Sequence, residues 1–152
     1  MRVEGVTLRN ASSWCCFFRG CDGVVARKVK IFNHCNWSND GIDIESSNVL
    51  VEDCDIDSED DSLVMKAREP GRVVENVVVR NCRLSCNAEH IKIGTESLGT
   101  FRNIRVEDCA VACRTPKCAT GGYIRFPGVL TLQAALSAIS LFVADGGSME
   151  NV

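Results

Sequence analysis

The chain has 152 residues, of which 45% are apolar and 24% charged, with a net charge of −3 and a mean hydropathy near zero. These values exclude a disordered chain and indicate one soluble globular domain over residues 1–152. The slightly acidic balance gives no basic field for nucleic acid. No signal peptide or membrane-spanning segment is expected, because the most apolar stretch, Val129 to Ala144, is interrupted by polar residues.

Five segments share an alternating apolar pattern that predicts pairs of short β-strands. In chain order they cover residues 1–8, 24–31, 48–56, 76–84 and 103–111, and each contains two strands separated by a bend. Their first apolar positions are 23 to 28 residues apart. These positions are Met1, Val24, Val49, Val77 and Ile104.

A third strand is expected in the middle repeats, at residues 40–46, 61–68 and 89–97. Three strands in a repeat of 23 to 28 residues predict an all-β fold, a right-handed parallel β-helix of five to six stacked coils. An antiparallel sandwich is the alternative, but it requires hairpin turns of about two to five residues and leaves the fixed period unexplained. Because the sequence ends without a polar or helical cap, we expect a partial domain, truncated at both ends.

The ten cysteines are placed like core residues rather than like disulfide partners. Cys54, Cys82 and Cys109 occupy the same position in three successive repeats, which predicts buried thiols. Zinc-ligand spacing is missing, so we expect no metal, and the glycine pattern indicates no nucleotide cofactor. Free thiols favour a reducing, cytoplasmic location, whereas a signal peptide upstream of a truncated start would direct the protein to the periplasm or outside the cell.

The third strands place carboxylates at one position in successive repeats. When their inward apolar residues are aligned, one column contains Asp40, Asp61 and Glu89, and we name it the acid column. Asp60 lies one residue before Asp61, and a register slip of one residue would bring it into the column instead. His90 follows Glu89 and is a further candidate member. The aligned inward residues are Ile42, Leu63 and Ile91.

Carboxylates stacked at strand spacing repel one another, and this repulsion raises the pKa of at least one of them. One carboxyl group then holds a proton near neutral pH while its neighbour is ionised, as acid/base hydrolysis of a glycosidic bond requires. Two other functions remain open. One is a carbohydrate-binding or structural β-helix without catalysis, and the other is a polysaccharide lyase in which acids bind Ca²⁺ and a Lys or Arg abstracts a proton. Acids that only bond the backbone at bends account for Asp53, Asp55, Asp57 and Asp108.

Two stretches resemble paired motifs of glycoside hydrolase family 28, the polygalacturonase family. They read NDGIDI, from Asn39, and EDDSLVMKA, from Glu59. The resemblance implies a right-handed parallel β-helix that hydrolyses pectic polysaccharides with inversion. It also implies that Asp40, Asp60 and Asp61 are catalytic, with Asp61 as the general acid and the other two holding the attacking water.

Two motifs of that family differ here. Its Gly-His-Gly motif is replaced by Ala88-Glu89-His90, and its substrate-binding Arg-Ile-Lys motif is matched only by Ile124-Arg125. Three basic residues on the third strands are candidate ligands for an anionic polysaccharide or oligosaccharide: Lys66, Arg68 and Lys92.

The remaining expectations concern side chains near these strands and the partners of the protein. We expect Trp14 to close one edge of the β-helix rather than to stack on a sugar. Glu96 is expected to approach Arg68 from the next coil, as an exposed ion pair. The sequence predicts a monomeric full-length protein without nucleic-acid or membrane partners.

Overall fold

The computed structural model describes residues 1–114 and 136–152, and these residues form strands, turns and bends without a helix. Two sheets are present. The nine-stranded sheet contains β1 (Arg2–Glu4), β3 (Cys16–Arg27), β5 (Ile42–Glu52), β7 (Leu63–Ala67), β8 (Val73–Arg80), β10 (Glu89–Ser97), β11 (Thr100–Glu107), β13 (Ser137–Leu141) and β14 (Ser148–Glu150). The five-stranded sheet contains β2 (Thr7–Arg9), β4 (Lys30–Asn33), β6 (Asp55–Ser58), β9 (Arg83–Ser85) and β12 (Ala110–Val111).

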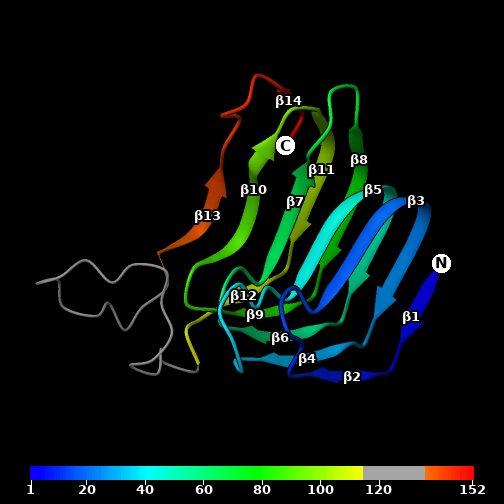
Figure 1. Ribbon diagram of the computed structural model, residues 1–152. Coiled ribbons are helices and arrows are strands. Elements are labelled where there is room, and N and C mark those ends of the chain that lie inside the picture. The colour runs from blue at the N-terminus through cyan, green and yellow to red at the C-terminus, as the bar shows by residue number, and fades with distance from the viewer. Residues whose placement is uncertain (115–135) are drawn as a thin grey trace, which may run out of the picture.

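The chain winds into stacked coils. Figure 1 shows the five-stranded sheet as a layer across the bottom, from which the strands of the larger sheet rise. The paired strands run parallel in both sheets. The fold is therefore the predicted right-handed parallel β-helix. None of the described residues belongs to a helix long and apolar enough to cross a membrane.

The number of coils differs from the prediction. About four turns are present, and they begin at β1, in the second half of β3, in the second half of β5 and at β8. The prediction of five to six coils is wrong because it extended the period beyond residue 111. Residues 115–135, between β12 and β13, lie outside the described part of the chain.

The apolar columns have the predicted register. Val49 pairs with Val77, and Val77 pairs with Ile104, in adjacent strands of the larger sheet. These three side chains are 2%, 0% and 6% exposed. Because parallel strands stack identical slots above one another, each coil adds one layer to a continuous apolar core.

The cysteine column lines the bend between the two sheets. Cys54 and Cys82 are buried, and Cys109 packs against the core while remaining partly exposed. The nine cysteines in the described part of the chain are free thiols. Cys54 and Cys82 occupy core positions that would otherwise hold small apolar residues, as free thiols commonly do.

A second bend, within the larger sheet, requires a left-handed backbone in every coil. Gly23 fills this position in one coil with φ of +78°, and asparagine fills it in the following coils. Asparagine tolerates positive φ better than other non-glycine residues. Each amide also donates to the side chain one coil earlier, as Asn76 Nδ2 does to Asn48 Oδ1 at 2.9 Å. The residues of this ladder are Asp22, Asn48, Asn76, Asn103 and Asn151.

Candidate functional site

The acid column exists where three neighbouring strands begin. Leu63 pairs with Ile42 on one side and with Ile91 on the other, which confirms the predicted register. Backbone bonds hold the residues just upstream: Gly41 N donates to Asp61 O at 2.8 Å, and Ser62 N donates to Glu89 O at 3.0 Å. The alternative register, with Asp60 in the column, is not adopted. The column therefore consists of Asp40, Asp61 and Glu89.

Asp40 is buried, with 2% of its surface exposed. Its Oδ2 lies 3.3 Å from the ammonium nitrogen of Lys66, whereas its Oδ1 has no hydrogen-bond partner in the described part of the chain. Burial raises the pKa of Asp40, the neighbouring carboxylate of Asp43 raises it further, and Lys66 partly opposes both effects. Asp40 is therefore a carboxyl group that keeps a proton more readily than an exposed aspartate.

Asp43 is a member of the site that the sequence analysis missed. Its side chain is fully buried, and its Oδ1 lies 3.1 Å from Lys66 Nζ. Burial raises the pKa of Asp43 to about 6, although Lys66 lowers it. The sequence could have predicted this member of the site, because strand alternation puts Asp43 and Lys66 on the same outward face of adjacent strands.

Asp61 is held through both carboxylate oxygens. Its Oδ1 accepts a hydrogen bond from the backbone N–H of Glu89 at 3.1 Å, and its Oδ2 lies 3.0 Å from Lys92 Nζ. Lys92 also contacts Glu89 Oε2 at 3.4 Å. Burial, together with the neighbouring Asp61 carboxylate, raises the pKa of Glu89 to about 7. Glu89, which lies beside Asp61, can thus hold a proton near neutral pH.

Asp60 completes the carboxylate cluster from outside the column. Its backbone N–H donates to Asn39 O at 3.4 Å, which places it beside the NDG stretch. Burial and the charges of Asp40 and Asp61 raise the pKa of Asp60 to about 7. The structure therefore brings together all three carboxylates that the sequence pointed to.

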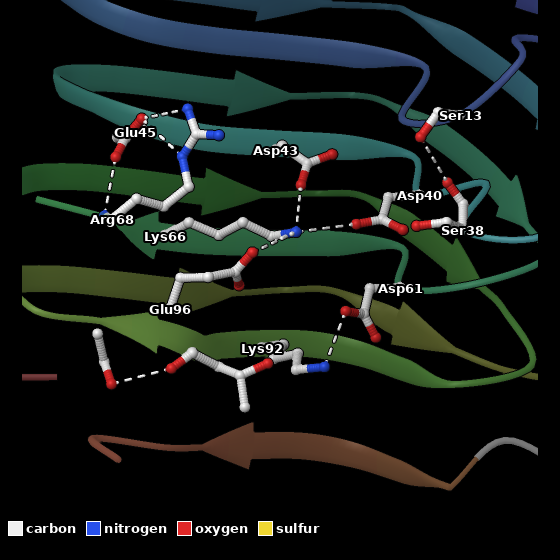
Figure 2. Close-up of polar contacts among 12 residues, drawn as sticks. Ser13, Ser38, Asp40, Asp43, Glu45, Asp61, Lys66, Arg68, Lys92 and Glu96 are labelled. Atoms are coloured by element: carbon white, nitrogen blue, oxygen red, sulfur yellow. Dashed lines mark hydrogen bonds and ion pairs between the residues drawn. The ribbon is translucent and has the colours of Figure 1, made fainter. Parts of the chain in front are cut away.

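The three candidate substrate-binding cations are engaged by acids of the protein (Figure 2). Lys66 is paired with Asp40 and Asp43, and Lys92 with Asp61 and Glu89. Arg68 makes two bonds to the fully buried carboxylate of Glu45, from Nε at 3.3 Å and from Nη2 at 2.9 Å. Glu96, expected beside Arg68, lies 3.7 Å from Lys66 Nζ.

His90 points away from the acid column. Its ring is buried, and its two nitrogens lie 3.0 Å from the backbone oxygens of Ser137 and Ala112. Strand alternation does not predict this placement, because it would put His90 on the same face as Lys92, which contacts Asp61. Glu89 therefore contributes the side chain next to Asp61, and His90 ties β10 to its neighbours.

Trp14 reaches the site from the preceding coil. The backbone N–H of Cys15 donates to Asp40 O at 3.0 Å, which fixes this segment beside the acid column. The ammonium of Lys66 lies 3.6 Å from the centroid of the Trp14 ring, and Phe17 packs edge-on at 5.3 Å. One face of the indole is thus covered by a cation rather than open to a sugar. No sequence pattern predicts this contact between Trp14 and Lys66.

The family model of Glycosyl hydrolases family 28 matches residues 1–116. The chain belongs to this family. No curated protein sequence matches the chain significantly. Among solved structures, a hyperthermoactive exopolygalacturonase from Thermotoga maritima resembles it with a TM-score of 0.66 and 28% sequence identity. The alignment covers 72% of this chain and 28% of the exopolygalacturonase, so the chain spans less than a third of that protein's length.

The family 28 match includes every residue of the acid cluster. Asp40, Asp60 and Asp61 all lie within residues 1–116, as do Lys66 and Lys92. Ile124-Arg125, the nearest match to the substrate-binding motif, lies outside the described residues. In the described part of this family 28 chain, no group of three or more His, Cys, Asp or Glu residues is arranged to hold a metal ion.

The raised pKa values make a prediction about folding stability. Asp and Glu in an unfolded chain have pKa values of about 4. In the folded protein the pKa of Asp43 is raised to about 6, and the pKa values of Asp60 and Glu89 are raised to about 7. Between these limits the folded state binds more protons than the unfolded state, so stability falls as pH rises. We expect the unfolding free energy to be at least about 3 kcal/mol lower at pH 8 than at pH 5, measured by urea denaturation.

Asp60→Asn should weaken this dependence, because the variant no longer buries a charge at high pH. Glu150→Gln, at an exposed carboxylate in β14, is the matched control and should retain the wild-type dependence. An unfolding free energy that rises between pH 5 and pH 8 in the wild-type protein would contradict the pKa directions.

Proposed function

We propose that this chain carries the acid/base centre of a glycoside hydrolase that cleaves pectic or related uronate-containing polysaccharide with inversion. The observation that carries the proposal is the cluster formed by the buried Asp40 and Asp61 with the partly buried Asp60, gathered from two adjacent coils. Membership of family 28 and the likeness to an exopolygalacturonase support it.

The proposed roles of Asp40, Asp60 and Asp61 follow the family resemblance, and the structure adds Glu89 beside Asp61. Asp61 donates a proton to the leaving glycosidic oxygen, and Glu89 keeps a proton in reserve beside it. Asp40 and Asp60 hold the water that attacks the anomeric carbon from the opposite side. During the reaction, the C–O bond to the leaving sugar breaks, a C–O bond to water forms, and water loses a proton to the carboxylate that holds it.

The first experiment is an assay of the full-length protein on polygalacturonate and on rhamnogalacturonan. We expect reducing ends to accumulate, and proton NMR of the first products should show the anomer opposite to that of the substrate. Asp61→Asn serves as the inactive control. An unsaturated product that absorbs in the ultraviolet would identify a lyase and overturn the proposal, as would retained anomeric configuration.

A non-catalytic carbohydrate-binding β-helix is the second candidate. It is favoured by Glu89, which stands where the family resemblance places a histidine, and by the ion pairs that occupy Lys66, Arg68 and Lys92. Isothermal calorimetry distinguishes the two functions. Binding of a pectic oligosaccharide without any release of reducing ends would establish the binding protein.

A further inference from the structure

Three carboxylates, from Asp40, Asp43 and Glu96, surround the ammonium group of Lys66 in Figure 2. Its ammonium nitrogen lies 3.1 Å from Asp43 Oδ1, 3.3 Å from Asp40 Oδ2 and 3.7 Å from Glu96 Oε1. The ring of Trp14 covers it at 3.6 Å, and only 6% of the Lys66 side chain is exposed. These partners come from the coils before and after β7, and Trp14 comes from the coil before those of Asp40 and Asp43.

This arrangement is costly as a stabilising device. A buried ammonium and two buried carboxylates lose their hydration, and apolar residues of similar volume often stabilise a fold equally well. The arrangement also disfavours contact with an anionic sugar, because each neighbouring acid competes for the ammonium. A substrate carboxylate would have to displace Asp40, Asp43 or Glu96 and approach beneath the indole ring.

One oxygen next to this enclosure stands out. Asp40 presents Oδ2 to Lys66, whereas its buried Oδ1 has no hydrogen-bond partner in the described part of the chain. Asp43 Oδ1 lies 3.1 Å from the same ammonium nitrogen. Lys66 thus touches both members of the pair and leaves one oxygen of Asp40 unused.

We propose that Lys66 is a positioning residue that acts through Asp43 and Asp40, fixing the orientation of both carboxyl groups so that Asp40 Oδ1 faces the reacting water. This inference rests on the proposed hydrolase function. It replaces the expectation that Lys66 binds the substrate carboxylate, and leaves that task to residues outside the enclosure. Trp14 serves as the cover that keeps bulk water away from the ammonium.

The charges around the enclosure set the direction of the expected pH effect. Lys66 lowers the pKa of both Asp40 and Asp43, so removal of the ammonium raises both. A nearby opposite charge changes a carboxyl pKa by about 1–3 units. The charged groups that face this region from the neighbouring elements are Asp40, Asp43, Asp60, Asp61, Lys92 and Glu96.

Steady-state kinetics of Lys66→Met and Lys66→Arg test the proposal. For Lys66→Met we expect kcat to fall about tenfold or more, KM to stay within about twofold, and the acidic limb of the pH–rate profile to move up by about 1–3 units. Lys66→Arg should recover part of kcat and the wild-type limb. An increase in KM with unchanged kcat would make Lys66 a substrate ligand and overturn the proposal.

A second measurement does not depend on turnover. In a Trp37→Phe background, Trp14 is the remaining tryptophan, and its fluorescence reports the cation on its ring. We expect a titration between pH 5 and pH 9 that disappears in Lys66→Met and shifts in Asp43→Asn. A titration unchanged in both variants would overturn the proposed coupling, even if Lys66→Met were too unstable for kinetics.

The two measurements separate the possible failures. If the protein shows no hydrolysis but Trp14 titrates through Lys66, the proposed function is wrong and the coupled enclosure stands. If the protein hydrolyses pectin but Lys66→Met retains wild-type kcat and pH profile, the proposed function stands and the positioning role is wrong.

Discussion

Asp61→Asn should lower kcat by about 100- to 10,000-fold with little change in KM. Asparagine is nearly isosteric and can still accept the hydrogen bond from Glu89 N, but it has no proton to donate to the leaving oxygen. Asp40→Asn and Asp60→Asn should also reduce kcat, because each removes a carboxylate that holds water. Initial rates of reducing-end release on pectic substrate measure the effect.

Asp53→Asn is the matched control for these variants. Asp53 lies at a bend with φ of +56°, a backbone that asparagine also adopts, and it is remote from the acid column. It should retain wild-type turnover. The melting temperature of each variant must be measured together with its activity, because Asp61→Asn also loses the ion pair with Lys92. Wild-type kcat in Asp61→Asn, or a loss explained by unfolding at the assay temperature, would refute the catalytic role of Asp61.

Gly41→Ala should destabilise the fold by about 3 kcal/mol or more. Gly41 lies between Asp40 and Ile42, where a Cβ would come within 2.4 Å of both Ser62 O and Ile56 Cγ2. Ser62 O cannot move away without breaking the bonding between coils, because it accepts a hydrogen bond from Ile42 N at 2.9 Å. Urea denaturation measures the loss, and activity should fall as Asp40 shifts relative to Asp61.

Gly71→Ala provides the comparison for this effect. A Cβ at Gly71 would meet no atom within 4 Å, although φ there is +77°. The substitution should therefore cost about 1–2 kcal/mol from backbone strain alone. Equal losses at the two positions would show that close packing at Gly41 does not hold the acid column in register.

Local sequence patterns were sufficient to predict the fold because the β-helix repeats them. Val49, Val77 and Ile104 occupy equivalent slots, and parallel stacking turns that equivalence directly into contact. The acid column followed from the same rule once Ile42 and Leu63 were aligned. The number of coils could not be predicted in the same way, because the repeat pattern becomes irregular after residue 111.

The surroundings of the site were harder to predict because alternation gives only the direction of a side chain. It puts Lys66 on the outward face, but it does not reveal that Trp14 covers that face from an earlier coil. The partner of Glu96 was missed for a similar reason. Arg68 and Lys66 both lie within reach of the next coil, and the nearly buried Lys66 makes the contact.

The stacked register also determines how the molecule responds to mechanical force. Each strand is bonded only to the coils before and after it, so tension on the N-terminus first loads β1 and β2 against β3 and β4. Rupture of that row frees the chain up to the next equivalent row, as from Val3 to Ala26, or roughly 80 Å of extended chain. The protein therefore lengthens in steps of one coil, and the acid column stays intact until the second row, which contains Asp40, is reached.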